Sequence, residues 1–171
     1  PKQRKNNTKF TFARYMFAFI RKRFGDLPVW KIAAAQRGMT DDNLIQSTNY
    51  KYLDEKGKIL DMEGFQVSLG PLALPLNLRA TRNGTLVSIT WDDPRDEPSA
   101  APTDRMMVGI FYADYRDTFT LEKETGTTRR DGKCEIILRD DDGEVCIHPF
   151  FARADNTAFS EDKAITLPDT E

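Results

Sequence analysis

The chain has 171 residues, with 25 Lys and Arg against 27 Asp and Glu, so its formal net charge is only −2. Apolar residues make up 39% and charged residues 30% of the sequence, which is typical of a globular protein with one domain and a small extension. No apolar run is long enough to span a bilayer, no secretory leader is recognisable, and two cysteines are too few for a disulfide framework.

The net charge hides an uneven distribution. The first 25 positions hold eight basic residues and no acidic one: Lys2, Arg4, Lys5, Lys9, Arg14, Arg21, Lys22 and Arg23. From Asp26 onward the chain has 17 basic and 27 acidic residues, which gives a formal charge of −10. A basic arm on an acidic body predicts that the arm has a separate role, in binding a partner.

Apolar residues in the arm follow a helical spacing. The main stripe is Phe10, Ala13, Phe17, Ile20 and Phe24, and it is widened by Phe12, Met16 and Phe19. This pattern predicts a helix over 8–24, capped by Asn7 or Thr8 and ended by Gly25, after a mobile segment over 1–7. Pro28 then predicts a short helix over 29–36, and Thr40 a second one through Ile45, whereas 50–63 shows no clear pattern.

From Phe65 the sequence changes to short alternating runs separated by turn residues. The expected strands are 76–81, 85–91, 106–112, 119–123, 133–138 and 145–151, with 160–167 closing the sheet. Asn83-Gly84 predicts a tight hairpin turn, and 92–104 a long loop. The predicted fold is α+β and mainly β, with N-terminal helices over 1–64 and an antiparallel fibronectin- or immunoglobulin-like β-sandwich over 65–171.

The turn Asp140–Gly143 predicts a second hairpin, between strands 133–138 and 145–151. In the register that this turn sets, Cys134 and Cys146 point to opposite faces of the sheet, which predicts two free thiols. Cys146 and His148 are two residues apart and would share a face.

The sequence predicts no catalytic residue, no cofactor and no metal site. His148 is the single histidine, and its apolar neighbours favour a packed role over that of a base or ligand. Asp140–Gly143 lacks the ligand spacing of a calcium loop and is better interpreted as an ordinary turn. Trp91 is in phase with the apolar residues of its strand, so a core position is favoured over a carbohydrate-binding platform.

Three interpretations of the basic arm remain open. It binds nucleic-acid phosphates, or it lies on an anionic membrane, or its apolar stripe packs on the chain's own body or on a neighbouring subunit. The third is favoured, because a stripe this wide would otherwise remain exposed. The residues predicted to mediate interaction are Arg14, Phe17, Ile20, Arg21, Lys22, Arg23 and Phe24.

Several short motifs, in order along most of the chain, resemble an uncharacterised Bacteroidota family, the domain of unknown function numbered 6266. They are Phe17–Ile20, Ser68–Leu72, Val87–Asp92, Asp104–Tyr112, Arg130–Gly132 and Val145–Ser160. The family carries a Gly- and Lys-rich segment ahead of its helix, which this chain lacks, and it begins at Pro1 rather than Met, so Pro1 need not be the native start. The resemblance implies a helix followed by a sandwich and transfers no catalytic residue.

The sequence therefore favours a non-enzymatic structural or interaction protein, a subunit of a bacterial surface or phage-derived assembly. Docking is expected through the amphipathic helix and the sheet edges, onto a protein partner or a second copy. The expected location is the cell surface, the extracellular space or a virion rather than the cytoplasm. The alternatives are nucleic-acid binding by the basic arm and carbohydrate binding by a face of the sandwich.

Overall fold

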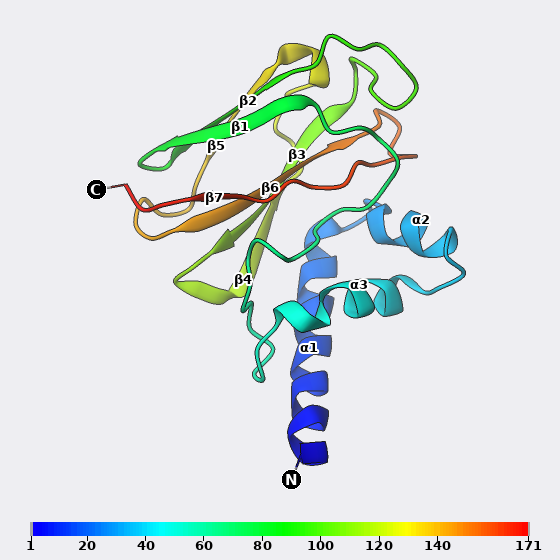
Figure 1. Cartoon of the computed structure of the whole chain (residues 1–171), viewed down its shortest axis with the longest axis vertical. Helices are drawn as coiled ribbons and strands as arrows, with labels where there is room; N and C mark the ends of the chain where they lie inside the picture. The colour runs from blue at the N-terminus through cyan, green and yellow to red at the C-terminus, as the bar shows by residue number, and fades with distance from the viewer. Residues whose placement is uncertain (1, 171) are drawn as a thin grey trace.

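A computed structural model describes the backbone of residues 2–170 and the side chains of residues 8–170 (Figure 1). The helices in this range are α1 (Lys2–Phe24), α2 (Val29–Ala35) and α3 (Asp41–Asn49), with 3-10 turns η1 (Tyr50–Tyr52) and η2 (Arg129–Asp131). The strands are β1 (Leu76–Asn83), β2 (Leu86–Asp92), β3 (Arg105–Tyr112), β4 (Tyr115–Glu122), β5 (Lys133–Ile137), β6 (Val145–Ala152) and β7 (Ile165–Leu167). No helix over the described backbone is long and apolar enough to cross a bilayer.

The strands form two antiparallel sheets, ordered β1-β2-β5 and β4-β3-β6-β7. In the constant-type immunoglobulin arrangement the fourth strand joins the first sheet, whereas here β4 pairs with β3 in the second sheet, which is a fibronectin-like arrangement. The predicted fold class, an α+β chain with helices ahead of an antiparallel sandwich, is confirmed.

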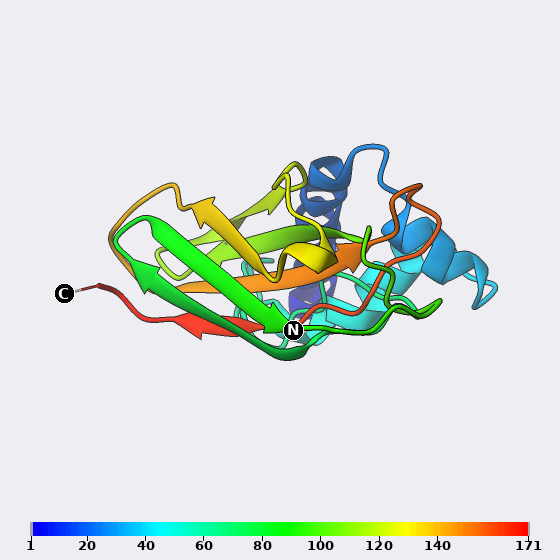
Figure 2. The ribbon, with the colours of Figure 1, turned by 90° about the horizontal axis from the view of Figure 1, so that it is seen from above.

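The second sheet is the central layer of the molecule. On β3, Met106, Val108 and Ile110 face the first sheet, while Met107 and Phe111 face the helices. This follows from the alternation of side chains along a strand, and it explains why the central strands β3 and β6 are almost continuously buried. Figure 2 looks down the axis of α1, with the strands on one side and α2 on the other.

Helices and strands share one of the two hydrophobic clusters. Phe17 and Phe24 of α1 belong to the same cluster as Phe111 and Phe119 of the central sheet. The boundary predicted between 64 and 65 therefore marks a change in secondary structure, while the core runs across it.

Helix α1 begins earlier than predicted. Its backbone is helical from Lys2, so the expected start near residue 8 and the expected caps at Asn7 or Thr8 are wrong. The expected mobility of residues 1–7 stays a prediction, and Pro1 lies outside the described residues. Lys2–Lys5 consists of good helix formers with no Gly or Pro, so the sequence allows the helix to begin at Lys2. The helix consequently extends well past the rest of the molecule (Figure 1).

The β1–β2 hairpin is confirmed, with Asn83 opposite Leu86 and Gly84 at a φ of 60° in the turn. The second predicted hairpin is wrong. Strand β5 pairs with β2, and β6 pairs with β3 and β7, so the turn over 140–143 carries the chain from one sheet to the other. Turn residues specify that a chain reverses, and they do not specify which sheet it enters.

The two cysteines are free, as predicted, but for a different reason, and both are buried. Cys134 lies opposite Ile89 in the first sheet, and Cys146 lies opposite Phe111 in the second. Cys134 points into the space between the sheets and Cys146 toward the helices. The thiols are kept apart by their sheets rather than by the register of one hairpin.

Candidate functional site

Three of the residues predicted to mediate interaction are inside the protein. Phe17, Ile20 and Phe24 are 3%, 1% and 3% exposed. The ring of Phe24 stacks on Phe119 at 6.2 Å, and that of Phe17 lies 6.5 Å from Phe65. The apolar stripe therefore packs on the chain's own sheet, and these three side chains are not accessible to a partner.

The four predicted cations lie outside this core. Arg14, Lys22 and Arg23 are exposed, and the guanidinium of Arg23 lies 4.5 Å from the ring centre of Phe19. Arg21 is partly buried, and its Nη1 lies 3.5 Å from Asp41 and 2.5 Å from Asp42. Arg21 thus joins α1 to the start of α3, whereas the other three cations face solvent.

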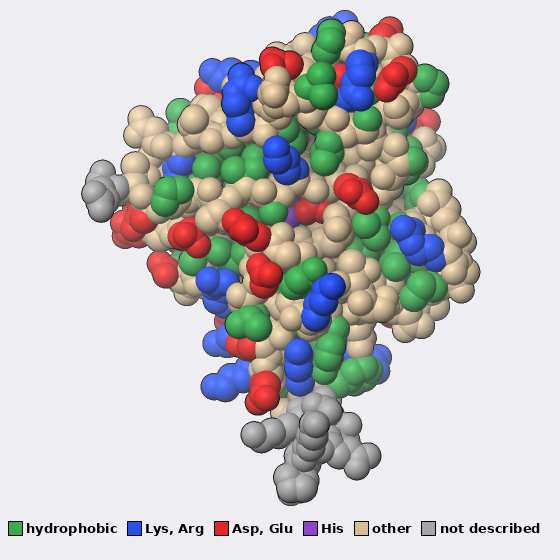
Figure 3. Space-filling view, in the orientation of Figure 1, with side chains coloured by type: hydrophobic (Ala, Val, Ile, Leu, Met, Phe, Trp, Pro, Cys, Tyr) green, Lys and Arg blue, Asp and Glu red, His purple; other side chains and the backbone are tan. Residues whose placement is uncertain are grey.

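The exposed apolar surface of α1 lies nearer its N-terminus than the sequence indicated. Phe10, Phe12 and Tyr15 are 44%, 42% and 70% exposed. Figure 3 shows Lys and Arg side chains beside hydrophobic ones along this part of the helix, below the rest of the molecule. Helical spacing placed Phe10 in the buried stripe, but spacing alone does not reveal where the sheet beneath the helix ends.

A groove runs between α1 and α3. Its wide end, of about 850 Å³, is lined by Lys9, Phe10, Met39, Asn43, Gln46, Ser47 and Tyr50. Its narrow part, of about 260 Å³, adjoins the wide end and shares Phe10, Asn43 and Gln46 with it. The narrow part is also lined by Arg14, Phe17, Ala18, Arg21, Thr40 and Asp42. We call these two adjoining depressions the α1–α3 groove.

The position of α3 is set by its N-terminus. Thr40 caps the helix, because its Oγ1 accepts a hydrogen bond from the backbone N–H of Asn43 at 3.2 Å. Leu44 and Ile45 are buried against the core. Asn43 and Gln46, three residues apart, therefore lie on the other side of α3 and form one wall of the groove.

Lys9 at the wide end of the groove and Arg14 in its narrow part have no acidic partner among the described residues. Lys9 Nζ lies 4.3 Å from the ring centre of Tyr50, and the guanidinium of Arg14 lies 6.0 Å from that of Phe10. No ion pair is formed by either cation within residues 8–170, in contrast to Arg21. The wide end of the groove is therefore both apolar and basic.

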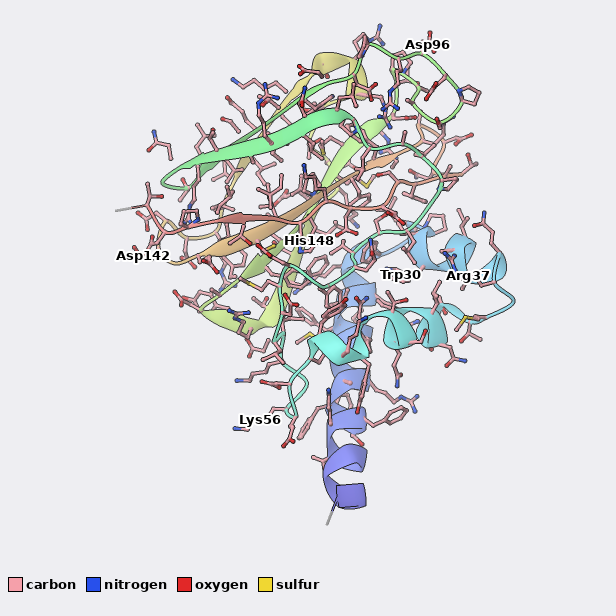
Figure 4. All side chains as sticks on the ribbon, viewed as in Figure 1. Trp30, Arg37, Lys56, Asp96, Asp142 and His148 are labelled. Atoms are coloured by element: carbon pink, nitrogen blue, oxygen red, sulfur yellow. The ribbon has the colours of Figure 1, made fainter. Side chains whose placement is uncertain are left out.

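A buried polar cluster surrounds His148, which lies between the central sheet and the segment that follows α3 (Figure 4). Its Nδ1 is 2.5 Å from Asp162 Oδ2, its Nε2 is 2.7 Å from the carbonyl oxygen of Met62, and Cys146 Sγ is 3.4 Å from Nε2. Sequence reasoning placed Cys146 and His148 on one face, which is confirmed, but it missed Asp162.

His148 is held as an imidazolium. Burial acts to lower its pKa, but the hydrogen bond and charge of Asp162, with a smaller contribution from Cys146, raise the pKa to about 9. Both ring N–H groups then donate, one to the Asp162 carboxylate and one to the Met62 carbonyl. Although Cys, His and Asp recur in nucleophilic sites, all three side chains are almost fully buried, so none of them is accessible to a substrate in this structure.

The His148 cluster ties three segments together. Asp162 Oδ1 accepts hydrogen bonds from the backbone N–H groups of Val67 and Ser68, each at 3.2 Å. Asp162 therefore links β6, the segment before β7 and the connection between helices and sandwich. No group of three or more His, Cys, Asp or Glu side chains within residues 8–170 has an arrangement that could hold a metal ion.

Trp91 is 4% exposed, so the favoured prediction of a core position is confirmed, and the alternative of a carbohydrate platform on this residue is wrong. Its Nε1 donates to the backbone oxygen of Arg129 at 2.9 Å. The Arg129 side chain is itself buried and pairs with Asp93 at 2.5 Å and Asp104 at 3.1 Å. Burial acts to raise the pKa of Asp93, but hydrogen bonds from Arg95 and Arg129 hold that pKa below its usual range.

Comparisons with known proteins bear on the fold alone. A solved structure described as a myokine is 18% identical, with a TM-score of 0.42, over 58% of this chain and 99% of that chain. The FN1–FN3 domains of chicken CNTN1 are 7% identical, with a TM-score of 0.42, over 61% of this chain, which spans only 34% of theirs. No protein-family model and no curated protein matches the sequence. The fold assignment rests on the strand order, and these two structures are similar to this chain at a level that transfers no function.

Proposed function

We propose that this chain is a non-enzymatic structural subunit that self-associates, with the sandwich as a rigid body and the projecting part of α1 as the docking element. The observation that carries the proposal is the division of α1 into two parts. Its second half is anchored in the core by Phe17, Ile20 and Phe24, whereas Phe12 and Tyr15 expose aromatic surface beyond the sheet. An anchored helix with an exposed aromatic end is suited to holding a neighbour in a fixed orientation.

A second copy is the partner that the charge distribution favours. The first 25 residues carry eight cations and no anion, whereas the rest of the chain carries a formal charge of −10. The arm of one copy is therefore complementary to the body of the next. Such a contact joins two different surfaces, so repetition would build a ring or a filament. This agrees with the proposed role in a surface or phage-derived assembly, at the cell surface or in a virion.

The proposal includes that the chain is not an enzyme. Cys146, His148 and Asp162 provide the nearest approach to a catalytic group, and the hydrogen bonds of the imidazole support a structural role for it. Membership of the Bacteroidota family that the motifs resemble stays a prediction.

The test is the molar mass of the full chain, measured by light scattering over a wide range of concentration. Self-association predicts a mass that rises with concentration and falls with added salt. The double variant Phe12→Ser/Tyr15→Ser should remain a monomer, while Tyr115→Ser, which changes an exposed aromatic residue on β4, should behave as the parent chain. A monomer at every concentration refutes the proposal.

Deleting the whole arm would not be a valid test. Residues 1–25 include Ala13, Phe17, Ile20 and Phe24, which are all core residues. Their loss would expose the central sheet and unfold or aggregate the protein. Substitutions of exposed side chains separate docking from stability.

Nucleic-acid binding is a second candidate, because Arg14, Lys22 and Arg23 are exposed and form no ion pair within residues 8–170. Binding to a DNA duplex would then weaken steeply with salt, and neutralising these three residues to Gln would reduce that dependence. Arg21 is left unchanged, because its ion pairs with Asp41 and Asp42 join two helices. Binding that is insensitive to salt excludes phosphate contacts.

A further inference from the structure

We propose that the α1–α3 groove binds an acidic amphipathic helix of a protein partner, with apolar side chains between Phe10 and Met39 and carboxylates at Lys9 and Arg14. This inference does not depend on self-association. Phe10 and Arg14, four residues apart, lie on the side of α1 that faces α3. Phe12 and Tyr15 lie on another side.

The shape of the groove suits a helix. Its walls are two helices, with Phe10, Arg14 and Ala18 from α1 on one side, and Asn43 and Gln46 from α3 on the other. The three α1 residues, each four apart, lie along one side of that helix over about two turns, whereas α3 crosses α1 at a steep angle (Figure 1) and bounds the groove on the other side. A partner helix can lie along this side of α1, as amphipathic helices do in the grooves of other helical proteins.

The apolar part of the groove is concentrated at its wide end. Phe10 is 44% and Met39 is 38% exposed, and both line the depression of about 850 Å³ together with the half-buried Tyr50. Met is a flexible side chain that adapts to different apolar partners. One or two Leu or Phe side chains of a partner helix would cover these residues and remove their surface from water.

Charge determines which helix fits. Lys9 at the wide end and Arg14 in the adjoining narrow part form no ion pair within residues 8–170, whereas Arg21 further along is neutralised by Asp41 and Asp42. A partner with carboxylates on the flanks of its apolar stripe would pair with Lys9 and Arg14. Asp42 and the amides of Asn43 and Gln46 line the opposite wall, which disfavours a continuous run of phosphates.

The experiment measures fluorescence anisotropy of a labelled synthetic peptide titrated with the full chain. The probe is a Leu- and Glu-rich peptide with its Leu residues on one helical face. One control peptide has the same composition with the Leu positions scrambled, and the other has Lys in place of Glu. The Phe12→Ser/Tyr15→Ser variant serves as the background, so that self-association does not compete.

The expected result is binding of the acidic amphipathic peptide, with neither control peptide binding comparably. Arg14→Glu and Phe10→Ser should each weaken it about tenfold. Lys133→Glu reverses an exposed charge on β5, and it should leave binding unchanged. Circular dichroism should show that all variants retain the fold of the parent.

Three outcomes of the peptide titrations would overturn the inference. They are equal binding of the scrambled peptide, equal binding of the Lys peptide, and undiminished binding to Arg14→Glu. Tighter binding of a single-stranded DNA than of the peptide would also overturn it and would favour the nucleic-acid alternative. None of these results affects the mass measurements, so failure of the groove and failure of self-association can be told apart.

Discussion

Replacing His148 with Gln should abolish a pH dependence of stability that the buried imidazolium creates. The folded-state pKa of His148 is raised to about 9 from an ordinary value of 6.5, chiefly by Asp162 and against the effect of burial. Because the pKa is raised on folding, this contribution to stability is fully present below pH 6.5 and is lost as the pH rises through about 9.

The size of the effect follows from the shift in pKa. Each unit corresponds to about 1.4 kcal/mol, so the full change between the two pKa values is about 3 kcal/mol. Between pH 6.5 and 9 the folded protein binds one proton that the unfolded chain does not, so the free energy of unfolding should fall by about 1.4 kcal/mol per pH unit. The sequence contains no other histidine, so no second imidazole contributes to the pH dependence in this range.

The assay is urea unfolding at a series of pH values from about 6 to 8.5, followed by tryptophan fluorescence, since Trp30 and Trp91 are both buried. The upper limit avoids Cys134, whose thiol pKa is raised by burial and which would add its own dependence at higher pH. His148→Gln should be less stable than the parent at pH 6 and lack the slope. Equal slopes in the parent and the variant would refute the assignment of an imidazolium.

Three further predictions concern stability and accessibility. Phe24→Ala removes a ring stacked in the core and should destabilise the protein by about 3–5 kcal/mol in urea unfolding, whereas Tyr15→Ala should change it by less than about 0.5 kcal/mol. Arg129→Leu removes the buried partner of Asp93 and Asp104, which keep only the partly exposed Arg95 and Arg153, and it should cost about 3–5 kcal/mol. Arg130 is exposed, so Arg130→Ala is a near-neutral control, and equal losses in the two variants would contradict the buried pairing. Both cysteines are about 1% exposed or less, so a thiol reagent should label neither in the native protein and both after unfolding; rapid native labelling would show that one of them is accessible.

Local patterns in the sequence predicted most of the elements of the sandwich. Strand β2 alternates buried and partly exposed positions throughout, and the Asn-Gly dipeptide before it marks the turn of its hairpin. These signals act over a few residues, so they can be read from the chain. The partner of β5 could not be predicted in this way, because its pairing with β2 depends on which of two sheets the chain enters.

The candidate sites depend on longer separations and were largely missed. His148 pairs with Asp162 fourteen residues away and with the Met62 carbonyl 86 residues away, and neither distance has a periodic signal. The α1–α3 groove likewise requires two helices that meet only in the fold. Helical periodicity identified the face of α1 that is buried, but the point along the helix at which this burial ends, between Ala13 and Phe10, is a tertiary property.

The burial of α1 also argues against the interpretation in which the basic arm lies on a membrane. Met16, Phe17, Ile20 and Phe24 are each at most 7% exposed, and burying a side chain of this kind contributes about 1.5–3 kcal/mol. Releasing all four to water would cost about 6–12 kcal/mol, which is comparable to the whole stability of an ordinary domain. A helix that lay on a membrane through this same stripe would first lose the free energy of burying these side chains in the core, and only contacts with lipid could offset that loss. The cations of α1 therefore act from a fixed helix, on whatever reaches the exposed end of α1 and the α1–α3 groove.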